Sequence, residues 1–333
     1  MSGITKLRKI DSILIPDAPD EIRLFMVIRN ESLRLPYLLK YYSRMGVDRF
    51  FFIDNDSTDG SLLFLLSQKN THVFWTNESF GMAKGGEDWL TALLHKYGQG
   101  HWCILADADE FFIYPHYEGV SLRDLIIFLN KTGSTVVNAL LLDMYSNKPI
   151  RLSKEKKGMN PLLASSYFDR DSHYWLGGSN RKLSDAIYCG GGVRRRVFGV
   201  KVLLNKAPFF KFKREFLLDR KHWINGGIGA EIEGIMLHFK FNSNFSSRVL
   251  EESKREEYWN KAYEYKHYLR TIIHNPKLNL YYSGSVKFKD SQQLVDLGLM
   301  KTSVTFEAFI EDLRSHIQPR SATLEPKNSL GVL

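Results

Sequence analysis

The sequence predicts an α/β protein built on a mostly parallel sheet flanked by helices. Short apolar runs that read as strands buried on both faces alternate with segments whose apolar residues recur at helical spacing. Two acidic loops follow two of these predicted strands, and ligands of parallel sheets bind beyond the carboxyl ends of strands. The chain has 333 residues, which is enough for one large domain or a domain with an extension.

Most of the predicted elements lie in the first half of the chain, where the two apolar patterns alternate. The predicted strands are 22–28, 50–53, 73–75, 102–106 and 136–142. The predicted helices are 35–45, 62–68 and 89–97, with a further helix opening at 121–124 like a capping box. Ser57 or Asp59 is available to cap the second of these helices.

The second half of the chain is less regular. Residues 151–234 are rich in Gly and Arg, and a strand containing His238 is predicted over 235–241. Residues 248–270 have the pattern of one charged amphipathic helix. The expected parts are an N-terminal segment, an α/β domain and a helical C-terminal extension, over 1–20, 21–245 and 246–333.

The positive charge of the chain limits the kinds of partner to expect. The net charge is +9 and the isoelectric point is about 9.3. The basic residues form short clusters at 154–157, 194–196 and 211–214 and no long basic tail. This pattern lacks the basic stripe expected of a nucleic-acid-binding protein. It is compatible with phosphorylated ligands and with peripheral contact with an anionic membrane.

The two cysteines and the apolar runs indicate the cellular compartment to expect. Cys103 and Cys189 form no CxxC pair, which excludes a zinc knuckle or a disulfide framework as the organising principle. No segment resembles a signal peptide, and no run reaches the ~18 apolar residues of a membrane span. We therefore expect a cytoplasmic protein, with contact at the inner face of the cell membrane left open by the positive charge.

The tetrapeptide Asp107-Ala108-Asp109-Glu110 is the most informative motif. Two carboxylates two residues apart, after a buried strand, can turn toward one divalent cation. Such oxygen ligands suit Mg²⁺ or Mn²⁺. Acidic pairs after strands are also common in turns, so the tetrapeptide alone leaves an ordinary turn open.

A second polar loop follows the strand 50–53. It carries three Asp, one Ser and one Thr between Asp54 and Gly60. Helix capping explains about half of these residues and leaves Asp54 and Asp56 unexplained. The triplet 29–31 after the first strand is either a polar loop or a turn that contacts a nucleotide.

These motifs occur in an order that resembles the family-2-type glycosyltransferases of the GT-A fold, in the branch with RNE, DNDSTDG and DADEF elements. The resemblance covers about residues 22 to 300. Its elements are Arg29-Asn30-Glu31, residues 46–50, 54–60, 100–102 and 107–111, followed by 191–199, 204–208 and 237–240.

The resemblance implies a nucleoside diphosphate sugar donor, with a UDP-sugar favoured, and a Mn²⁺ or Mg²⁺ ion. Asp107 and Asp109 match the DxD positions that hold the metal on the donor diphosphate. Asp54 or Asp56 matches the acidic position that contacts the base or ribose. Arg29 and Glu31 stand where the first loop closes on the nucleotide.

Further residues are candidates for the same site. A lone His in a strand is usually structural, but many GT-A enzymes complete the metal shell with a His after the DxD, and His238 resembles that element. Lys84 precedes a helix and either meets a phosphate or is solvated. If 194–196 is a strand, Arg194 and Arg196 face one side, where they either grip the diphosphate or an anionic acceptor or are simple surface charges.

Family-2-type members generally invert at the anomeric carbon, which implies direct displacement by an acceptor hydroxyl and a hexosyltransferase activity. The acceptor is expected to be a glycan or a lipid-linked molecule, in surface polysaccharide or lipopolysaccharide synthesis. The reaction needs a general base, usually Asp or Glu. The candidates in this chain are Asp169, Asp171, Glu231 and Glu233.

Two other classes of function remain open. A sugar-phosphate nucleotidyltransferase usually opens with a Gly-rich phosphate loop, and no glycine follows the first strand here. The second class is a glycosyltransferase-like protein that only binds glycans or scaffolds an assembly. Loss of the acidic pair would favour this class, and the pair is intact.

Overall fold

The computed structural model describes residues 7–171, 173–176, 188–219 and 223–316. In this part of the chain, nine strands form one mixed sheet in the order β1-β4-β3-β2-β5-β11-β7-β14-β6. The strands are β1 (Arg8–Lys9), β2 (Ile22–Ile28), β3 (Arg49–Asp54), β4 (Thr71–Trp75), β5 (Trp102–Leu105), β6 (Glu110–Ile113), β7 (Val136–Asp143), β11 (Asn205–Lys211) and β14 (Gly229–His238).

The direction of the strands confirms the predicted mostly parallel sheet. β2 is parallel to β3 and β5, β3 is parallel to β4, and β7 is parallel to β14. β1, β11 and β6 run antiparallel to their neighbours. Six of the nine strands therefore end at one edge, which is called the carboxyl edge below, and β6 and β11 begin there.

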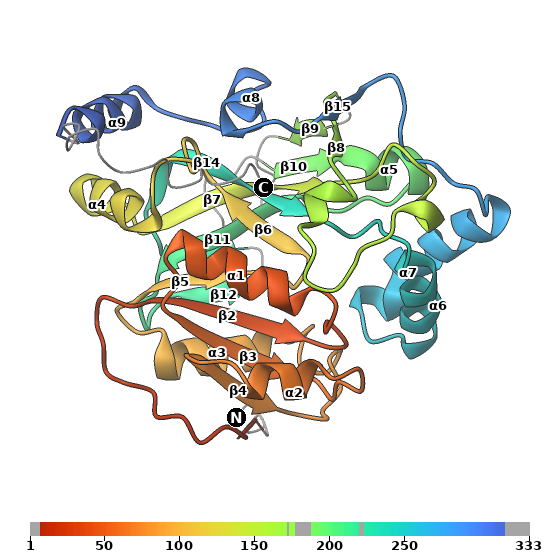
Figure 1. Cartoon of the computed structure of the whole chain (residues 1–333), viewed down its shortest axis with the longest axis horizontal. Coiled ribbons are helices and arrows are strands. Elements are labelled where there is room, and N and C mark those ends of the chain that lie inside the picture. Colours follow the sequence, from red (N-terminus) through yellow and green to blue (C-terminus); the bar gives the residue numbers. More distant parts are fainter. Residues whose placement is uncertain (1–6, 172, 177–187, 220–222, 317–333) are drawn as a thin grey trace, which may run out of the picture.

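Helices cover both faces of the sheet, as predicted for an α/β protein (Figure 1). α1 (Leu35–Met45), α2 (Ser61–Leu66) and α4 (Leu122–Thr132) pack on the face that carries Leu24, Met26 and Phe52. α3 (Glu87–Tyr97) packs on the opposite face, against Phe25 and Phe51. The alternation of the two faces along β2 and β3 explains why both strands read as continuous apolar runs.

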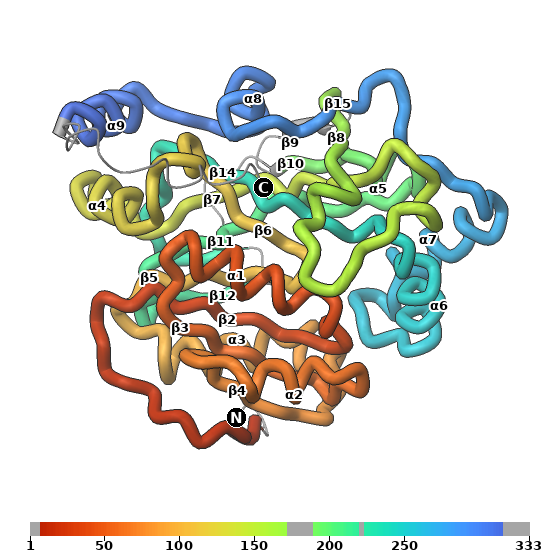
Figure 2. Tube along the Cα trace, in the orientation of Figure 1, coloured from red at the N-terminus to blue at the C-terminus, as the bar shows by residue number. Residues whose placement is uncertain are grey.

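A helical extension follows the sheet, as predicted. It consists of α6 (Phe245–Arg255), α7 (Trp259–His274), α8 (Ser291–Asp296) and α9 (Val304–His316). α6 and α7 share a separate apolar core with α5 (Gly192–Phe198) that includes Phe198, Phe241 and Tyr268. Figure 2 shows the chain leaving β14 and running into α6 and α7, which lie beside the loop after β2.

Smaller elements surround the second half of the sheet. Among the described residues they are the paired strands β9 (His173–Leu176) with β10 (Tyr188–Gly191), β12 (Leu217–Asp219) with β13 (Trp223–Asn225), and β8 (Tyr167–Asp169) with β15 (Ser285–Lys287), and the 3₁₀ turns Ile150–Leu152 and Pro161–Leu163.

Three local predictions are wrong. The charged segment 248–270 is two helices, because Glu256 adopts a left-handed φ of 55° that ends α6 at Arg255, and α7 begins only at Trp259. The segment 194–196 lies in α5 and is not a strand, since Gly191 and Gly192 adopt φ values of 104° and 67° and turn the chain into a helix.

The third wrong prediction concerns the cap of α2. The N-cap residue of this helix is Gly60, so neither Ser57 nor Asp59 stands at the capping position. The Asp59 carboxylate accepts a hydrogen bond from the Ser61 amide at 3.0 Å, and the Ser57 hydroxyl accepts one from the Asn30 amide at 3.0 Å. Ser57 thus joins the loops after β2 and β3 instead. The capping box of α4 is confirmed, with Ser121 and Asp124 bonded reciprocally.

Candidate functional site

The carboxyl edge of the sheet gathers charged residues from five strand ends. Asp109 lies in the turn from β5 to β6, and Glu110 begins β6. Asp143 ends β7, and His238 ends β14 directly beside it in register. Because β7 and β14 are parallel neighbours, their last side chains meet at the same edge. The loop after β2 adds Arg29 to Arg34 above them, and α6 and α7 face this edge (Figure 1).

A chain of ion pairs runs through this edge from α5 to the loop after β2. Arg194 Nε donates to Asp143 Oδ2 at 2.8 Å, and Asp143 Oδ1 lies 2.6 Å from His238 Nδ1. His238 Nε2 lies 3.5 Å from Asp109 Oδ2, which in turn lies 3.6 Å from Arg34 Nη1. The five side chains are 12% exposed or less, so each charge depends on its neighbours for compensation.

The ion pairs shift the pKa values of the central groups. Burial alone lowers the pKa of His238, but the Asp109 and Asp143 carboxylates outweigh it and raise the pKa to about 8. Burial raises the pKa of Asp109, but His238 and Arg34 hold it well below its ordinary value. With the Nδ1 side facing Asp143, the Nε2 side of the ring faces Asp109 and the space beyond it.

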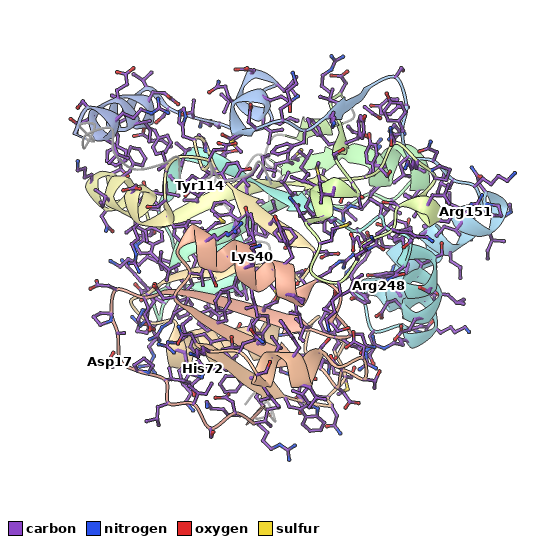
Figure 3. All side chains as sticks on the ribbon, viewed as in Figure 1. Asp17, Lys40, His72, Tyr114, Arg151 and Arg248 are labelled. Atoms are coloured by element: carbon purple, nitrogen blue, oxygen red, sulfur yellow. The ribbon has the colours of Figure 1, made fainter. Side chains whose placement is uncertain are left out.

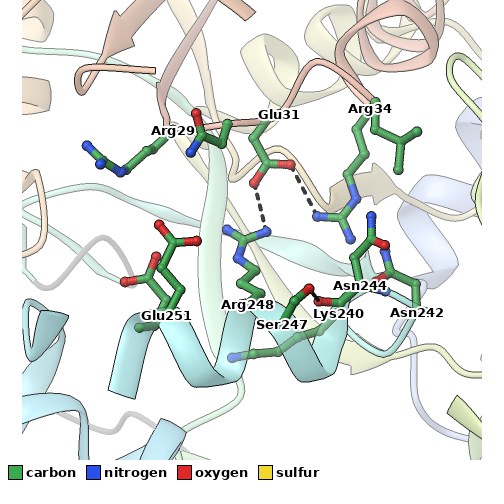
Figure 4. A pocket seen from close by; sticks show the side chains of 12 residues that line it. Arg29, Glu31, Arg34, Lys240, Asn242, Asn244, Ser247, Arg248 and Glu251 are labelled. Carbon is green, nitrogen blue, oxygen red and sulfur yellow. Dashed lines mark hydrogen bonds and ion pairs between the residues drawn. The ribbon is translucent and has the colours of Figure 1, made fainter. Parts of the chain in front are cut away.

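Arg34 and Glu31 tie the loop after β2 to distant segments. Glu31 Oε1 lies 2.8 Å from Arg248 Nη1 on α6, and Glu31 Oε2 lies 3.3 Å from Arg34 Nη1. Arg34 also contacts Glu155 and donates to the Phe239 carbonyl at 3.0 Å. These contacts fix α6 across the carboxyl edge, as the dashed lines in Figure 4 show for Glu31.

A pocket lies between the carboxyl edge and α6–α7, and is called the inner pocket. Its floor comes from the sheet side, with Asp107, Ala108, Asp109 and His238. The cations Arg29, Lys240, Arg248 and Arg255 surround it. The remaining lining residues are Val27, Ile28, Glu31, Asn55, Phe80, Glu252, Tyr258 and Tyr265. A hollow that has two carboxylates and an imidazole on its floor, two further carboxylates and four cations suits an anionic ligand that brings its own metal ion.

Aromatic rings close one side of the inner pocket. Tyr258 contacts Phe80 at 5.2 Å and Tyr265 at 4.7 Å between centroids. Glu257 holds this corner, because its Oε2 accepts hydrogen bonds from Ser79 Oγ at 2.5 Å and from the Gly81 amide at 2.7 Å. A Cβ atom at Gly81 would lie 2.8 Å from the Glu257 carbonyl oxygen, so this approach requires glycine.

The structure brings five of the predicted ligand residues to one pocket. Arg29, Glu31, Asp107, Asp109 and His238 all line the inner pocket. Asp109 and His238 are close enough to share a cation, and the Asp143 carboxylate orients the imidazole as carboxylates do behind metal-bound histidines. Asp107 is 43% exposed and lies 4.0 Å from Lys206. Within the described ranges, no group of three or more His, Cys, Asp or Glu residues forms a complete cation site.

Asp54 and Asp56 occupy different positions in the loop after β3. Asp54 is fully buried, and its Oδ1 accepts a hydrogen bond from the Ser57 amide at 2.9 Å. Its Oδ2 has no hydrogen-bond partner in the described structure, and burial raises the pKa of this carboxyl. Asp56 is exposed and adopts a φ of 58°, and neither residue lines the inner pocket.

Three predicted cations for the donor lie elsewhere. Lys84 is 67% exposed and pairs with Asp88, one helical turn away. Arg194 is buried behind the site against Asp143, and Arg196 pairs with Asp169. Because 194–196 is helical, the expected alternation of faces does not occur, and neither arginine lines the inner pocket.

None of the four predicted base residues lines this pocket. Asp169 is 2% exposed and accepts hydrogen bonds from Tyr145 at 2.6 Å and Arg196 at 2.7 Å. Asp171 is exposed and pairs with Arg170. Glu231 and Glu233 lie in the first half of β14, and a strand rise of ~3.3 Å per residue puts them about 15 to 25 Å before its carboxyl end.

Sequence reasoning missed the contribution of the C-terminal helices. Arg248, Glu252, Arg255, Tyr258 and Tyr265 all line the inner pocket, and Lys240 lines it from the segment between β14 and α6. The segment 248–270 has the charged amphipathic pattern of an ordinary surface helix, so its composition does not indicate that it lines a pocket. The available signal was the buried half of that pattern, since Val249, Glu252 and Ser253 are buried together on α6.

No family model matches the chain. A glycosyltransferase family 92 protein of Ricinus communis is 28% identical to it over 142 residues, which are 40% of this chain and 24% of that protein. The match thus spans about a quarter of the curated relative.

Two solved structures cover most of the chain at low similarity. A 4-diphosphocytidyl-2C-methyl-D-erythritol synthase is 10% identical, covers 84% of this chain and 99% of its own, and has a TM-score of 0.26. A glucose-1-phosphate thymidylyltransferase from Bacillus anthracis in complex with sucrose is 11% identical. The match covers 86% of this chain and 99% of that chain, with a TM-score of 0.27. These TM-scores are too low to support an inference.

In the described ranges, every helix is too short or too polar to span a membrane.

Proposed function

We propose that the protein is a glycosyltransferase that moves a sugar from a nucleoside diphosphate sugar to an acceptor hydroxyl. The observation that carries this proposal is the inner pocket, where Asp109 and His238 lie 3.5 Å apart beneath four cations. A diphosphate needs its negative charge compensated both in the bound donor and in the leaving group. Arg29, Lys240, Arg248 and Arg255 supply that compensation at the carboxyl edge, where α/β sheets bind their ligands.

The two ends of the inner pocket suit the two ends of such a donor. Phe80 and Tyr258 offer ring faces for a base. Asp107, Asp109 and His238 lie toward the sheet, where the diphosphate would meet them. We propose UDP-sugars as the favoured donors, with a hexosyl group transferred. Asp54 would reach the nucleoside only if a ligand contacts its unpaired Oδ2 atom.

We propose that Mn²⁺ or Mg²⁺ binds at Asp109 and His238, with Asp107 beside them. The residues fit such an ion, because Asp143 fixes the imidazole with Nε2 toward Asp109. Mg²⁺ sites typically use one or two carboxylates and take substrate phosphates and water as further ligands. When bound, the ion would act as a Lewis acid that neutralises the leaving diphosphate. The chain's own cations orient the donor through its phosphates.

The match with the family 92 glycosyltransferase of Ricinus communis supports a transferase that uses nucleotide sugars. Placement beside the family-2-type enzymes, and inversion at the anomeric carbon, are proposals that rest on the motif order alone. The same holds for a role in surface polysaccharide or lipopolysaccharide synthesis. A cytoplasmic location is likewise a proposal, and peripheral contact with an anionic membrane is proposed from the net charge of +9.

The proposal is tested by incubating the full chain with UDP-, GDP- and dTDP-sugars, with and without Mn²⁺, and identifying the products by mass spectrometry. We expect one donor to raise the melting temperature in the presence of Mn²⁺ and to release a nucleoside diphosphate. Release of pyrophosphate from a nucleoside triphosphate and a sugar phosphate would instead identify a nucleotidyltransferase. Binding of glycans without any turnover would identify a scaffold or glycan-binding protein.

A further inference from the structure

A second pocket opens beside the inner pocket, between α6 and the loop after β2 (Figure 4). It is called the outer pocket. Five residues line both pockets and form the wall between them: Arg29, Glu31, Lys240, Arg248 and Glu252. A ligand in the outer pocket would therefore lie directly against a donor in the inner one.

The wall contains two carboxylates, Glu31 and Glu252, and they differ in the segments that their ion pairs join. Glu31 uses both oxygens for ion pairs with arginines of different segments, Arg248 at 2.8 Å and Arg34 at 3.3 Å. Its backbone amide donates a hydrogen bond to Ser61 Oγ at 2.8 Å. These contacts explain Glu31 as the link between α6 and the loop after β2.

Glu252 makes no comparable link. Both of its oxygens lie 2.9 Å from Arg255 Nη1, one turn along the same helix, and among the described residues no other side chain is bonded to them. The side chain is only 7% exposed. Burial raises the pKa of the Glu252 carboxyl, although Arg255 and Arg248 lower it. A buried carboxylate that joins no segments to one another is poorly explained as scaffolding.

We propose that the outer pocket binds the acceptor and that Glu252 is the general base that takes the proton of its hydroxyl. This inference rests on the proposed function. The acceptor oxygen forms a bond to the anomeric carbon while its proton passes to the Glu252 carboxylate. The bond between the anomeric carbon and the diphosphate oxygen breaks, and the nucleoside diphosphate leaves with the electron pair beside the cations of the inner pocket.

The lining of the outer pocket indicates the class of acceptor. Its remaining residues are Asn30, Leu33, Arg34, Asn242, Asn244, Ser247 and Glu251. None of the described lining residues is aromatic, so the pocket offers amides, a hydroxyl and charges and lacks a stacking surface. Such a lining suits a polyhydroxylated group, such as the terminal sugar of a glycan.

The test uses the full chain with UDP-sugars as donors and the methyl glycosides of glucose, galactose and N-acetylglucosamine as acceptor probes. Glu252→Gln keeps the shape of the side chain and removes its basicity. We expect it to reduce transfer by about 100-fold or more while the affinity for UDP changes less than about twofold. The acid limb of the pH–rate profile should disappear with the carboxylate. Glu256→Gln is the matched control, since Glu256 is exposed, pairs with Lys266 and lines neither pocket.

Transfer by Glu252→Gln within fivefold of the unchanged chain would overturn the assignment of the base and leave the proposed function intact. If that variant does not fold, Glu252→Asp decides. Retracting the carboxylate by one methylene should lower transfer by about tenfold or more at unchanged UDP affinity, and an unchanged rate would overturn the assignment. A full chain that binds none of UDP, GDP and dTDP and transfers to no probe would overturn the proposed function, and this inference with it.

Discussion

Two buried charge clusters lie at opposite ends of the parallel strands. The amino-end cluster consists of Asp11, Glu21, Arg23, Arg49 and His72. The carboxyl-end cluster consists of Arg34, Asp109, Asp143, Arg194 and His238. Figure 3 shows His72 on the side of the molecule away from Arg248, which lies at the carboxyl edge. Each cluster combines one imidazole with two carboxylates and two arginines.

The clusters differ in what surrounds them. Glu21 is bound by both Arg23 and Arg49, and Arg49 Nη1 lies 3.1 Å from His72 Nε2. The amino-end cluster lines neither pocket. In the carboxyl-end cluster, Asp109 and His238 face the inner pocket. The comparison shows that residue types alone do not distinguish a site from scaffolding, whereas the strand end and the adjoining pocket do.

The pKa values of the two histidines shift in opposite directions, and in both cases the balance between burial and nearby carboxylates decides the direction. Burial lowers the pKa of His72, and the single carboxylate of Asp11, 3.4 Å away, does not offset it. For His238, Asp109 and Asp143 outweigh burial and raise the pKa to about 8.

The largest expected effect is on activity. Asp109→Asn removes a charge from the inner pocket and should lower transfer by about 100-fold or more, because the candidate cation site loses a ligand. Steady-state transfer rates measure this, and circular dichroism checks that the fold is kept. An active Asp109→Asn variant would remove the basis for treating the carboxyl-end cluster as the site.

The matching change in the amino-end cluster should act on stability alone. Glu21→Gln leaves Arg23 and Arg49 without their shared carboxylate and should lower the free energy of unfolding by about 3 kcal/mol. Urea unfolding measures the loss. The transfer rate per folded molecule should stay the same, and a large fall in it would mean that the amino-end cluster also serves catalysis.

The pH dependence of stability separates the two histidines. In the absence of metal, His238 contributes stability that is full below pH 6.5 and is lost as the pH rises through about 8. This contribution is about 2 kcal/mol. His72 has the opposite sign, because its lowered pKa removes stability as the pH falls below 6.5. Unfolding curves in EDTA at pH 5.5 and 8.5 measure how much less stable each variant is than the unchanged chain. This loss of stability should shrink from pH 5.5 to 8.5 for His238→Gln and grow for His72→Gln. Parallel shifts in both variants would contradict the charge assignments.

The smallest expected effect is at Lys84. This residue was a candidate phosphate ligand, but its side chain is exposed and pairs with Asp88. Lys84→Ala should leave both the melting temperature and the affinity for UDP almost unchanged, because an exposed ion pair contributes little to stability. Calorimetric titration with UDP checks this, and a clear loss of affinity would return Lys84 to the site.

The sequence was most informative where one local pattern decides the structure. The apolar run of β2 predicted its bounds, Ile22–Ile28, and the helical spacing predicted α1 over Leu35–Met45. The position of Asp109 after β5 followed from the same patterns. His238 could only be raised as a candidate, because its neighbour Asp143 comes from a strand almost a hundred residues earlier.

The contribution of α6 could not be predicted, because it depends on contacts between distant segments. Arg248 and Glu252 look like ordinary members of a charged helix until Glu31 is placed opposite them. Residue type alone makes Glu231 and Glu233 candidate bases, and only the bounds of β14 place them far from the carboxyl edge.

Calorimetric titration of UDP, GDP and dTDP into the full chain and into Asp109→Asn, with and without Mn²⁺, tests the central claim most directly. The account predicts that one nucleotide binds the unchanged chain more tightly with Mn²⁺, and that Asp109→Asn loses about tenfold or more of this affinity. Equal affinity of the two proteins in Mn²⁺, or no binding of any nucleotide, would contradict it.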